Sequence, residues 1–272
     1  MFAIVKTPIC PLMTKPQPDC ELADEALLGM VVEILEETNA DYRRVRTHYR
    51  YEGYAPAACL ETDPERVAAW QAAEKRVVLH KNFCDVQAGP KVQAWTLTTP
   101  TLGALLVPLG EPEDNWQAVL LPDGRKGYTR SSILDVYYKN PIDLPETQLR
   151  LRLVATAKLY ARAPYRWGGK SPLGIDCSGL VSMAYLLNGI LIYRDAHIKE
   201  DFPIHEIKRD RIGPGDLLFF PGHVAMYMGE TLYLHSTGRA GSDGFDVNSL
   251  DPTSPLYRED LAKGITAVAS YF

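Results

Sequence analysis

The sequence has no pair of cysteines spaced as Cys-x-x-Cys and few cysteines in all. The five are Cys10, Cys20, Cys59, Cys84 and Cys177. An odd count without close spacing argues against a disulfide framework and against a zinc site built from thiolates. Four of them are expected to be small buried side chains, the usual state of a free cysteine. Only Cys177 lies in a sequence context that indicates chemistry.

The chain also lacks long apolar runs and basic runs. No apolar stretch approaches the roughly 18 residues of a membrane-spanning helix, and no Lys/Arg stripe indicates nucleic-acid binding. The formal net charge is −5. The first residues have neither the basic segment nor the apolar core of a signal peptide. We therefore predict a cytoplasmic protein that binds neither nucleic acid nor membrane, provided that no leader precedes this chain.

The first half contains an internal repeat with a constant offset. Four landmarks recur 74 residues later: Gly29 as Gly103, Tyr42 as Trp116, Gly53 as Gly127, and Leu60 as Leu134. A constant offset over separated landmarks indicates two copies of one small module. Short apolar or β-branched segments separated by turns, at residues 31–35 and 42–46, predict that each copy is a small β-barrel.

Two further segments complete the predicted domain organisation. Pro64 opens a stretch rich in helix formers, which predicts a short linking helix. Residues 140–145 read Asn-Pro-Ile-Asp-Leu-Pro and have linker composition. Apolar residues at helical spacing then open a third domain. The predicted boundaries are 1–62 for the first barrel, 63–75 for the linking helix, 76–138 for the second barrel, and 139–272 for the third domain.

Cys177 is the candidate nucleophile. Residues 175–181 read Ile-Asp-Cys-Ser-Gly-Leu-Val, and the spacing of Leu180, Ala184 and Leu187 predicts a helix that begins near the cysteine. The unpaired amides and positive dipole end of a helix favour a thiolate over a thiol. The same amides can donate to the oxyanion of a tetrahedral intermediate.

His223 and His235 are the candidate base and orienter. A hairpin with its turn at Gly229 and Glu230 would place the two histidines opposite each other or one position apart. One imidazole could then take the thiol proton while the other holds its tautomer. An alternative is a zinc site formed by these histidines and Cys177, but no carboxylate or second cysteine has ligand spacing. We predict no metal and no cofactor.

Five motifs in this order carry a family resemblance: Tyr-Arg-Trp-Gly-Gly at 165–169, Asp-Cys-Ser-Gly-Leu at 176–180, Gly-Pro-Gly-Asp-Leu at 213–217, His-Val-Ala-Met-Tyr at 223–227, and Leu-His-Ser at 234–236. Residues 140–272 resemble the NlpC-type family of papain-like bacterial cell-wall peptidases. The repeat resembles the bacterial SH3-like barrel. The resemblance implies an α+β fold, with a papain-like catalytic domain after two small SH3-like β-barrels. It also implies a triad of Cys177, His223 and His235, with Tyr165 beside the oxyanion site.

The two barrels ahead of this domain resemble one subgroup, the γ-D-glutamyl-L-diamino acid endopeptidases. These cysteine peptidases hydrolyse murein stem peptides that have a free N-terminal L-alanine. The resemblance implies that the first barrel closes over the cleft and supplies a tyrosine and an acid to the substrate amine. Tyr51 matches the tyrosine, and Glu21 is the candidate acid, with Glu25 as the alternative. The expected partners are small soluble muropeptides in cell-wall recycling.

Three more residues are candidates for substrate binding. Asp176 and Ser178 flank the nucleophile, where they can meet a substrate ammonium or cap the helix. Asp195 lies in an Arg-Asp-Ala segment that matches the family's Arg-Asp-Ser, and Ala196 removes one hydrogen bond to substrate. Two other functions stay open: a wall-binding protein whose catalytic domain has decayed, and an amidase or acyltransferase that uses the same triad.

Overall fold

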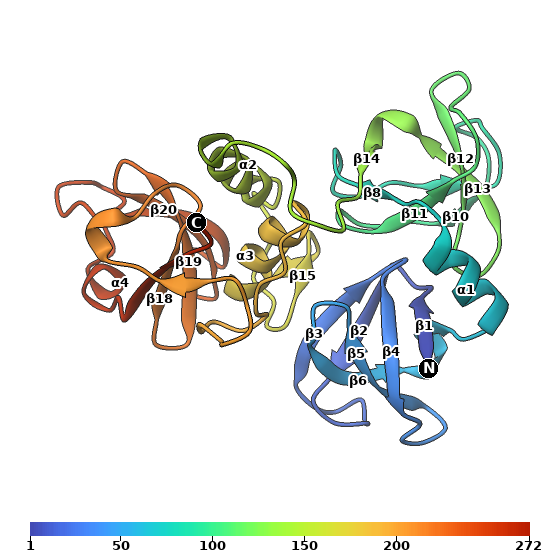
Figure 1. The fold of residues 1–272 in the computed structure, drawn as a ribbon, viewed down its shortest axis with the longest axis horizontal. Coiled ribbons are helices and arrows are strands. Elements are labelled where there is room, and N and C mark those ends of the chain that lie inside the picture. The colour runs from blue at the N-terminus through green and yellow to red at the C-terminus, as the bar shows by residue number, and fades with distance from the viewer. The chain divides into compact units, whose positions relative to one another are not determined.

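The computed structural model describes all 272 residues and divides them into two compact units, Met1–Tyr137 and Tyr138–Phe272. The first unit holds both copies of the repeat, and the second unit holds the candidate catalytic residues. Figure 1 labels the helices and strands of each unit. None of the helices has the length and apolar character that crossing a membrane requires.

The first unit contains two seven-stranded sheets with the same strand order. The neighbours run β3-β2-β6-β5-β4-β1-β7 in one sheet and β10-β9-β13-β12-β11-β8-β14 in the other. Subtracting seven from each label of the second order reproduces the first, so the predicted repeat of a small barrel is confirmed. The first barrel consists of β1 (Phe2–Val5), β2 (Ile9–Met13), β3 (Leu22–Leu27), β4 (Val31–Glu36), β5 (Tyr42–Thr47), β6 (Glu52–Pro56) and β7 (Leu60–Glu61). The second consists of β8 (Arg76–Val78), β9 (Val86–Gln87), β10 (Thr96–Thr98), β11 (Leu105–Pro108), β12 (Trp116–Leu120), β13 (Lys126–Arg130) and β14 (Leu134–Val136).

A short helix, α1 (Pro64–Ala72), connects the barrels. Its first residue is Pro64, and the Asp63 side chain caps it by accepting the N–H of Arg66. Proline at the first helical position and aspartate at the N-cap are both favourable. Val67 and Trp70 are the buried residues of α1. They pack with Ile4 and Val107, one residue from each barrel.

The turn between β3 and β4 joins the two barrels more closely. Leu28 is buried in the core of the second barrel, and its carbonyl accepts the N–H of Leu105 at 2.8 Å. Gly29 follows with φ of +83°, and a Cβ there would lie 2.3 Å from the Leu105 carbonyl oxygen. The Gly29 carbonyl in turn accepts the indole N–H of Trp70 at 2.9 Å. Only glycine fits this close approach of two backbones.

The second unit packs two helices against an antiparallel sheet. The strand order of this sheet is β17-β22-β18-β19-β20-β21. All ten residues of α3 are buried, because α2 covers one side of the helix while β19 and β20 lie against the other. The main elements are α2 (Glu146–Lys158), β15 (Lys170–Ser171), β16 (Gly174–Ile175), α3 (Cys177–Leu186), β17 (His205–Glu206), β18 (Leu217–Phe220), β19 (His223–Gly229), β20 (Leu232–Thr237), β21 (Gly244–Ser249), α4 (Glu259–Lys263) and β22 (Ala267–Ser270).

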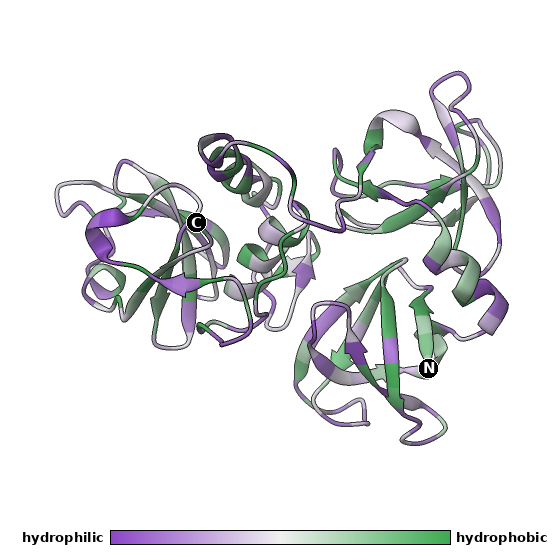
Figure 2. Ribbon diagram, in the orientation of Figure 1, coloured by the Kyte–Doolittle hydropathy of each residue, from purple (hydrophilic) through white to green (hydrophobic).

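The sheet of the second unit buries side chains on both faces. Leu218, Phe220 and Ala225 pack into one cluster with partly buried residues from the loops and α4. Figure 2 shows hydrophobic residues along the strands and hydrophilic residues in many of the connecting loops. This distribution and the strand order match the predicted fold class, an α+β papain-like domain preceded by two SH3-like barrels, which is confirmed.

Candidate active site

Cys177 is the first residue of α3. Its side chain is 6% exposed, and its sulfur accepts backbone N–H groups from Ser178 and from Val224 on β19. Val224 directly follows His223, so this hydrogen bond fixes the nucleophile beside the strand that carries the candidate base. The predicted position of the cysteine at a helix amino end agrees with the structure.

The loop before α3 is held in place by Asp176, the N-cap of the helix. One carboxylate oxygen accepts the N–H of Gly179, and the other accepts the N–H of Gly168 at 2.8 Å. A Cβ on Gly179 would lie 2.2 Å from the carbonyl oxygen of Gly169. The glycine that follows Cys-Ser is therefore needed because the first turn of the helix packs directly on this loop.

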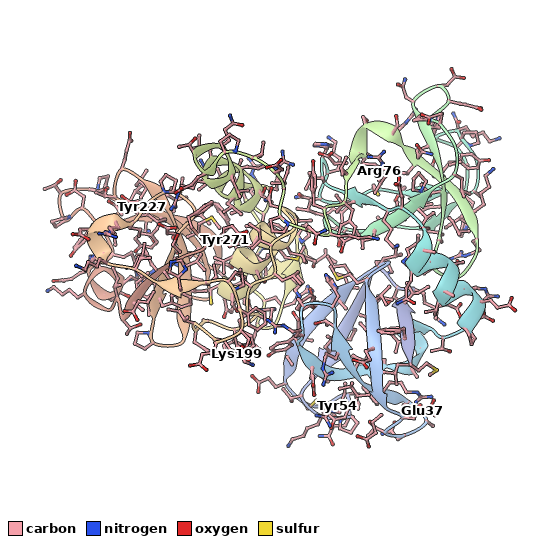
Figure 3. The ribbon with its side chains drawn as sticks, viewed as in Figure 1. Glu37, Tyr54, Arg76, Lys199, Tyr227 and Tyr271 are labelled. Atoms are coloured by element: carbon pink, nitrogen blue, oxygen red, sulfur yellow. The ribbon has the colours of Figure 1, made fainter.

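His223 and His235 lie on adjacent antiparallel strands, but they are not directly opposed. The pairing of β19 with β20 places Tyr227, labelled in Figure 3, opposite Tyr233. Continued to the start of β19, the same register places Thr237 opposite His223. The prediction of a direct or one-position pairing is therefore wrong. The histidines are two positions apart and share one face of the sheet, as diagonal neighbours.

The position of the turn explains this difference. Glu230 and Thr231 have φ of 51° and 68°, so they form the turn, and Gly229 pairs with Leu232 across an irregularity in the ladder. The predicted turn, at Gly229 and Glu230, lies one position earlier in the chain. Diagonal neighbours with long side chains still reach each other.

Three side chains form a continuous hydrogen-bonded chain behind the nucleophile. His223 Nε2 lies 2.7 Å from His235 Nδ1, and His235 Nε2 lies 2.9 Å from Asn248 Oδ1. Asn248 comes from β21, where it pairs with Tyr233 of β20. His235 is fully buried and Asn248 is 7% exposed. Asn248 is the residue of this site that sequence reasoning missed.

Asn248 determines which nitrogen acts as the base. Its Oδ1 only accepts, so His235 must carry its proton on Nε2, and the Nδ1 of neutral His235 must accept. His223 therefore donates its Nε2–H to His235. The remaining nitrogen of His223, Nδ1, keeps its lone pair and is the atom that can take the thiol proton. The direction of the hydrogen bonds follows from one amide oxygen.

Burial keeps the nucleophile and the base neutral in the substrate-free site. Desolvation raises the pKa of the Cys177 thiol to about 11, and the Asp176 carboxylate acts in the same direction. Desolvation lowers the pKa of His223 to about 4, with His235 as the next cause. The pKa of His235 is also lowered by burial. Desolvation therefore opposes the thiolate that the helix amino end and the N–H donors favour.

Tyr165 lies close to the nucleophile. The backbone of Tyr165 forms an isolated β-bridge with Ile175, which lies two positions before Cys177. The Tyr165 N–H donates to the Asp243 carbonyl. Burial raises the pKa of Tyr165 to about 12, and the charges of Cys177 and Asp176 act in the same direction. The hydroxyl therefore stays protonated near neutral pH and is available as a hydrogen-bond donor.

Asp176 and Ser178 are bound by a buried arginine. Arg194, 1% exposed, donates from Nη1 to Asp176 and Ser178 at 3.0 and 2.8 Å, and from Nη2 to Asp176 at 3.1 Å. The capping role considered for Asp176 is thus present, together with an ion pair that the sequence did not indicate. Asp195 follows Arg194 in the segment between α3 and β17.

The predicted amine-binding residues lie in the first barrel. Glu21 is exposed and immediately precedes β3, whereas Glu25 lies within β3 and is buried. The Tyr49 hydroxyl donates to Asp24 and lies 3.4 Å from the Glu25 carbonyl oxygen, which ties the loop bearing Tyr51 to that part of β3. Glu21 is four residues away, about 13 Å along an extended strand. The geometry of the first unit favours the alternative acid.

The other cysteines differ partly from expectation. Cys10 and Cys84 are buried, but Cys20 and Cys59 are half-buried, so the prediction of four buried cysteines is wrong for two of them. The alternative of a zinc site also meets an obstacle in the geometry. His223 Nε2 and His235 Nδ1 point at each other, and His235 Nε2 points at an amide oxygen. These three nitrogens are occupied by hydrogen bonds.

Two segments of the chain match known families. Residues 162–257 match the NlpC/P60 family. Residues 12–60 match the bacterial dipeptidyl-peptidase Sh3 domain. The first match contains all four residues of the hydrogen-bonded site: Cys177, His223, His235 and Asn248.

Several known proteins are similar over most of the chain. "Dipeptidyl-peptidase 6" of Lysinibacillus sphaericus is 46% identical over 275 residues, which covers 100% of both chains. "Gamma-D-glutamyl-L-lysine dipeptidyl-peptidase" of Bacillus cereus is 28% identical, covering 89% of this chain and 74% of that protein. The crystal structure of an NlpC/P60 family protein from Bacillus cereus has a TM-score of 0.81 and 24% identity, covering 100% of this chain and 99% of that chain. This last similarity concerns the fold.

Proposed function

This chain belongs to the NlpC/P60 family of cysteine peptidases, and from that premise we propose its reaction. It hydrolyses the γ-D-glutamyl–L-diamino acid bond of murein stem peptides that have a free N-terminal L-alanine. The observation that carries the proposal is the chain from Asn248 through His235 to His223, beside a thiol at a helix amino end. The name of the Bacillus cereus relative supports the choice of bond.

The geometry assigns a role to each atom of the acyl transfer. The Cys177 sulfur attacks the γ-carbonyl carbon of the D-glutamyl residue while Nδ1 of His223 takes the thiol proton. The oxyanion accepts from the N–H of Cys177, one of the first helix amides without a partner, and from the Tyr165 hydroxyl. His223 then protonates the amine of the diamino acid as the C–N bond breaks. Water hydrolyses the thioester by the same route in reverse, which releases the dipeptide.

Neutral reactants suit this mechanism. Burial holds the thiol and the imidazole of His223 uncharged, with pKa values of about 11 and about 4. The proton moves only when the sulfur attacks, so charge develops at the oxyanion where donors are already placed. His235 accepts the Nε2–H of His223 throughout and stabilises the imidazolium that forms.

We assign recognition of the substrate amine to two residues of the first barrel. Glu25 and Tyr51 supply a carboxylate and a phenol that meet the ammonium of the terminal alanine. A charge-assisted hydrogen bond of this kind contributes about 1.5–3 kcal/mol. Ser178 and Asp195 are the further candidates for contacts with the substrate. Because acetylation removes the ammonium charge and adds bulk, an acetylated peptide would leave the carboxylate unpaired.

We also propose a cytoplasmic role in cell-wall recycling, in which the enzyme acts on small soluble muropeptides. The proposed preference for a free amino terminus is consistent with this role, because that group is exposed only after a stem peptide has been released from the glycan. Purified sacculi and soluble stem peptides, offered at equal peptide concentration, distinguish the two substrates. Release of fragments from sacculi at a comparable rate would contradict recycling.

The decisive experiment compares two enzymes with two substrates. The tripeptide L-Ala-γ-D-Glu-L-Lys and its N-acetyl form are incubated with the unmodified enzyme and with Glu25→Gln, and dipeptide release is followed by mass spectrometry. We expect the free peptide to be cleaved about 10²-fold faster by the unmodified enzyme. Glu25→Gln should reduce that advantage and leave the acetylated peptide unaffected.

Glu21→Gln is the matched control, because it removes a similar charge four residues away. It should behave as the unmodified enzyme does. Equal cleavage of free and acetylated peptides by the unmodified enzyme would refute the amine requirement. A loss of selectivity in Glu21→Gln alone would show that the acid has been misassigned.

A further inference from the structure

Two free cysteines are in contact in the first barrel, and the proposed reaction uses neither. Cys10 on β2 is fully buried in the barrel core. Cys59 is the last residue of a short 3₁₀-helix over Ala57–Cys59 and packs against that core. The Cys10 thiol donates a hydrogen bond to the Cys59 sulfur. Cys59 is half-buried, so solvent reaches only one member of the pair.

The second barrel has the same two positions but only one cysteine. The 74-residue offset aligns Cys10 with Cys84, and Cys59 with Ile133. Ile133 also ends a 3₁₀-helix, and it packs against the core cluster that contains Cys84. The two positions are therefore neighbours in both barrels. Because the second barrel folds with isoleucine at one of them, the fold itself does not require a pair of thiols there.

The surroundings of Cys59 favour its thiolate. The hydrogen bond from Cys10 is the main cause that lowers the pKa of Cys59 to about 6. The Thr7 hydroxyl and the charge of Lys6 lower this pKa further, against the effect of desolvation. The same contact with Cys59 raises the pKa of Cys10. By contrast, burial raises the pKa of Cys84, which has no cysteine partner, to about 11. The first barrel thus pairs an attacking thiolate with a thiol that keeps its proton.

We propose that Cys10 and Cys59 form a reversible disulfide when a hydroperoxide reaches the first barrel. The Cys59 thiolate attacks one oxygen of hydrogen peroxide, so that an S–O bond forms, the O–O bond breaks and the released hydroxide becomes water by taking up a proton. Cys59 is then a sulfenic acid. The Cys10 sulfur attacks the Cys59 sulfur, the S–S bond forms and the S–O bond breaks. The oxygen leaves as water with the Cys10 proton. Two thiols are oxidised while one peroxide is reduced to two waters.

The proposed bond would join β2 to the segment just before β7. Strands β3 to β6 therefore lie within the loop that it closes, and a cross-link over a long loop restricts the unfolded chain. The same loop contains Glu25 and Tyr51, the residues assigned to the substrate amine. Formation of the disulfide itself needs no substrate, so the inference does not depend on the proposed hydrolysis.

The test maps the thiols of the full, reduced chain. The protein is treated with hydrogen peroxide, free thiols are blocked with iodoacetamide in denaturant, and the digest is analysed by mass spectrometry without reductant. We expect a cross-linked pair of peptides that holds Cys10 and Cys59, and dithiothreitol should return both as thiols. Because the thiolate is the attacking form, the rate of cross-linking should fall as the pH is lowered through about 6. Recovery of Cys10 as a free thiol while Cys59 is converted to sulfinic acid would overturn the proposal.

Three variants assign the two roles. Cys10→Ala removes the thiol that resolves the sulfenic acid, so peroxide should leave a sulfenic acid on Cys59 that dimedone traps. Cys59→Ala removes the attacking thiolate and should leave Cys10 reduced at the same dose of peroxide. Cys84→Ala, at the position equivalent to Cys10, is the matched control and should form the cross-link as the unmodified protein does. Undiminished oxidation of Cys10 in Cys59→Ala would overturn the proposal even if Cys10→Ala failed to fold.

Discussion

The two units of the molecule use polar side chains in opposite ways. In the second unit the functional groups are buried: His235 is fully buried, and Asn248 fixes its tautomer. In the first unit several charged residues on the sheet faces are partly exposed, as in the pair of Arg44 and Glu52, while Asp24 and Glu25 of β3 are buried. Exposed pairs contribute about 0–1 kcal/mol, whereas each member of a buried hydrogen-bonded chain affects the others. We therefore expect substitutions in the second unit to slow every substrate, and substitutions in the barrels to change selectivity or stability.

The nucleophile offers the most severe test of this comparison. Cys177→Ala should abolish hydrolysis of both the free and the acetylated tripeptide, because no other group can form the thioester. The fold should be retained, since alanine is favourable at the start of a helix. Mass spectrometry follows the products, and thermal unfolding checks the fold. Cys59→Ala is the control in the barrel unit. Turnover by the first variant, or loss of turnover in the second, would contradict the assignment.

Substitutions of the two histidines should have the next largest effects on kcat, and these effects should differ. His223→Ala removes the base and should cost about 10²–10⁴ in kcat. His235→Gln should retain more activity than His235→Ala, because a glutamine amide can accept from His223 and donate to Asn248. Steady-state kinetics on the free tripeptide provide the measurement. If all three variants were equally inactive, His235 would have a role beyond orientation.

Asn248 should have a smaller effect with a distinctive pH dependence. Asn248→Ala leaves a buried imidazole N–H unpaired and should reduce kcat about tenfold. Asn248→Asp places a negative charge beside His235 and should raise the pKa of both histidines. His223, with a pKa of about 4 in the unmodified protein, stays neutral and active down to that pH. A raised pKa moves the loss of activity to higher pH. Superimposable profiles of kcat/KM against pH would contradict the role of Asn248.

A substitution at the contact between the two barrels should change stability alone. Trp70→Phe removes the indole donor 2.9 Å from the Gly29 carbonyl and should lower the free energy of unfolding by about 1–3 kcal/mol. The rate per folded molecule should not change. Urea unfolding measures the loss, and Trp95→Phe, at an 80% exposed position, is the control. A change in kcat without a change in stability would break the division between the two units.

Much of the fold and three members of the site could be predicted from the sequence. The repeat can be recognised because the two barrels need the same turns at equivalent positions, such as Gly29 and Gly103. Equivalent residues therefore recur at one constant spacing. The position of Cys177 at the start of a helix could be predicted because a helix start after a glycine-containing loop has a short local sequence pattern. These features depend on neighbours in the chain, which is why a single sequence contains them.

The remaining features depend on contacts between distant segments. The hairpin register was wrong because Glu230 and Thr231 form the turn, one position later than Gly229 and Glu230, and the ladder is irregular beside it. Asn248 had no motif, since only the pairing of β21 with β20 brings it to His235. The ion pair of Arg194 with Asp176 joins residues 18 apart in the sequence, on either side of α3. No local pattern encodes such partners.

The turn at Leu28 and Gly29 has a consequence for how this architecture can evolve. Because Leu28 completes the core of the second barrel, a gene rearrangement that removed the first barrel would leave a hole in its neighbour. A second barrel moved into another protein would therefore need another side chain to fill this space in its core before it could fold stably. The duplicated barrels are expected to be inherited, lost and recombined as a pair, and relatives with a single barrel should carry a larger residue where Leu28 now inserts.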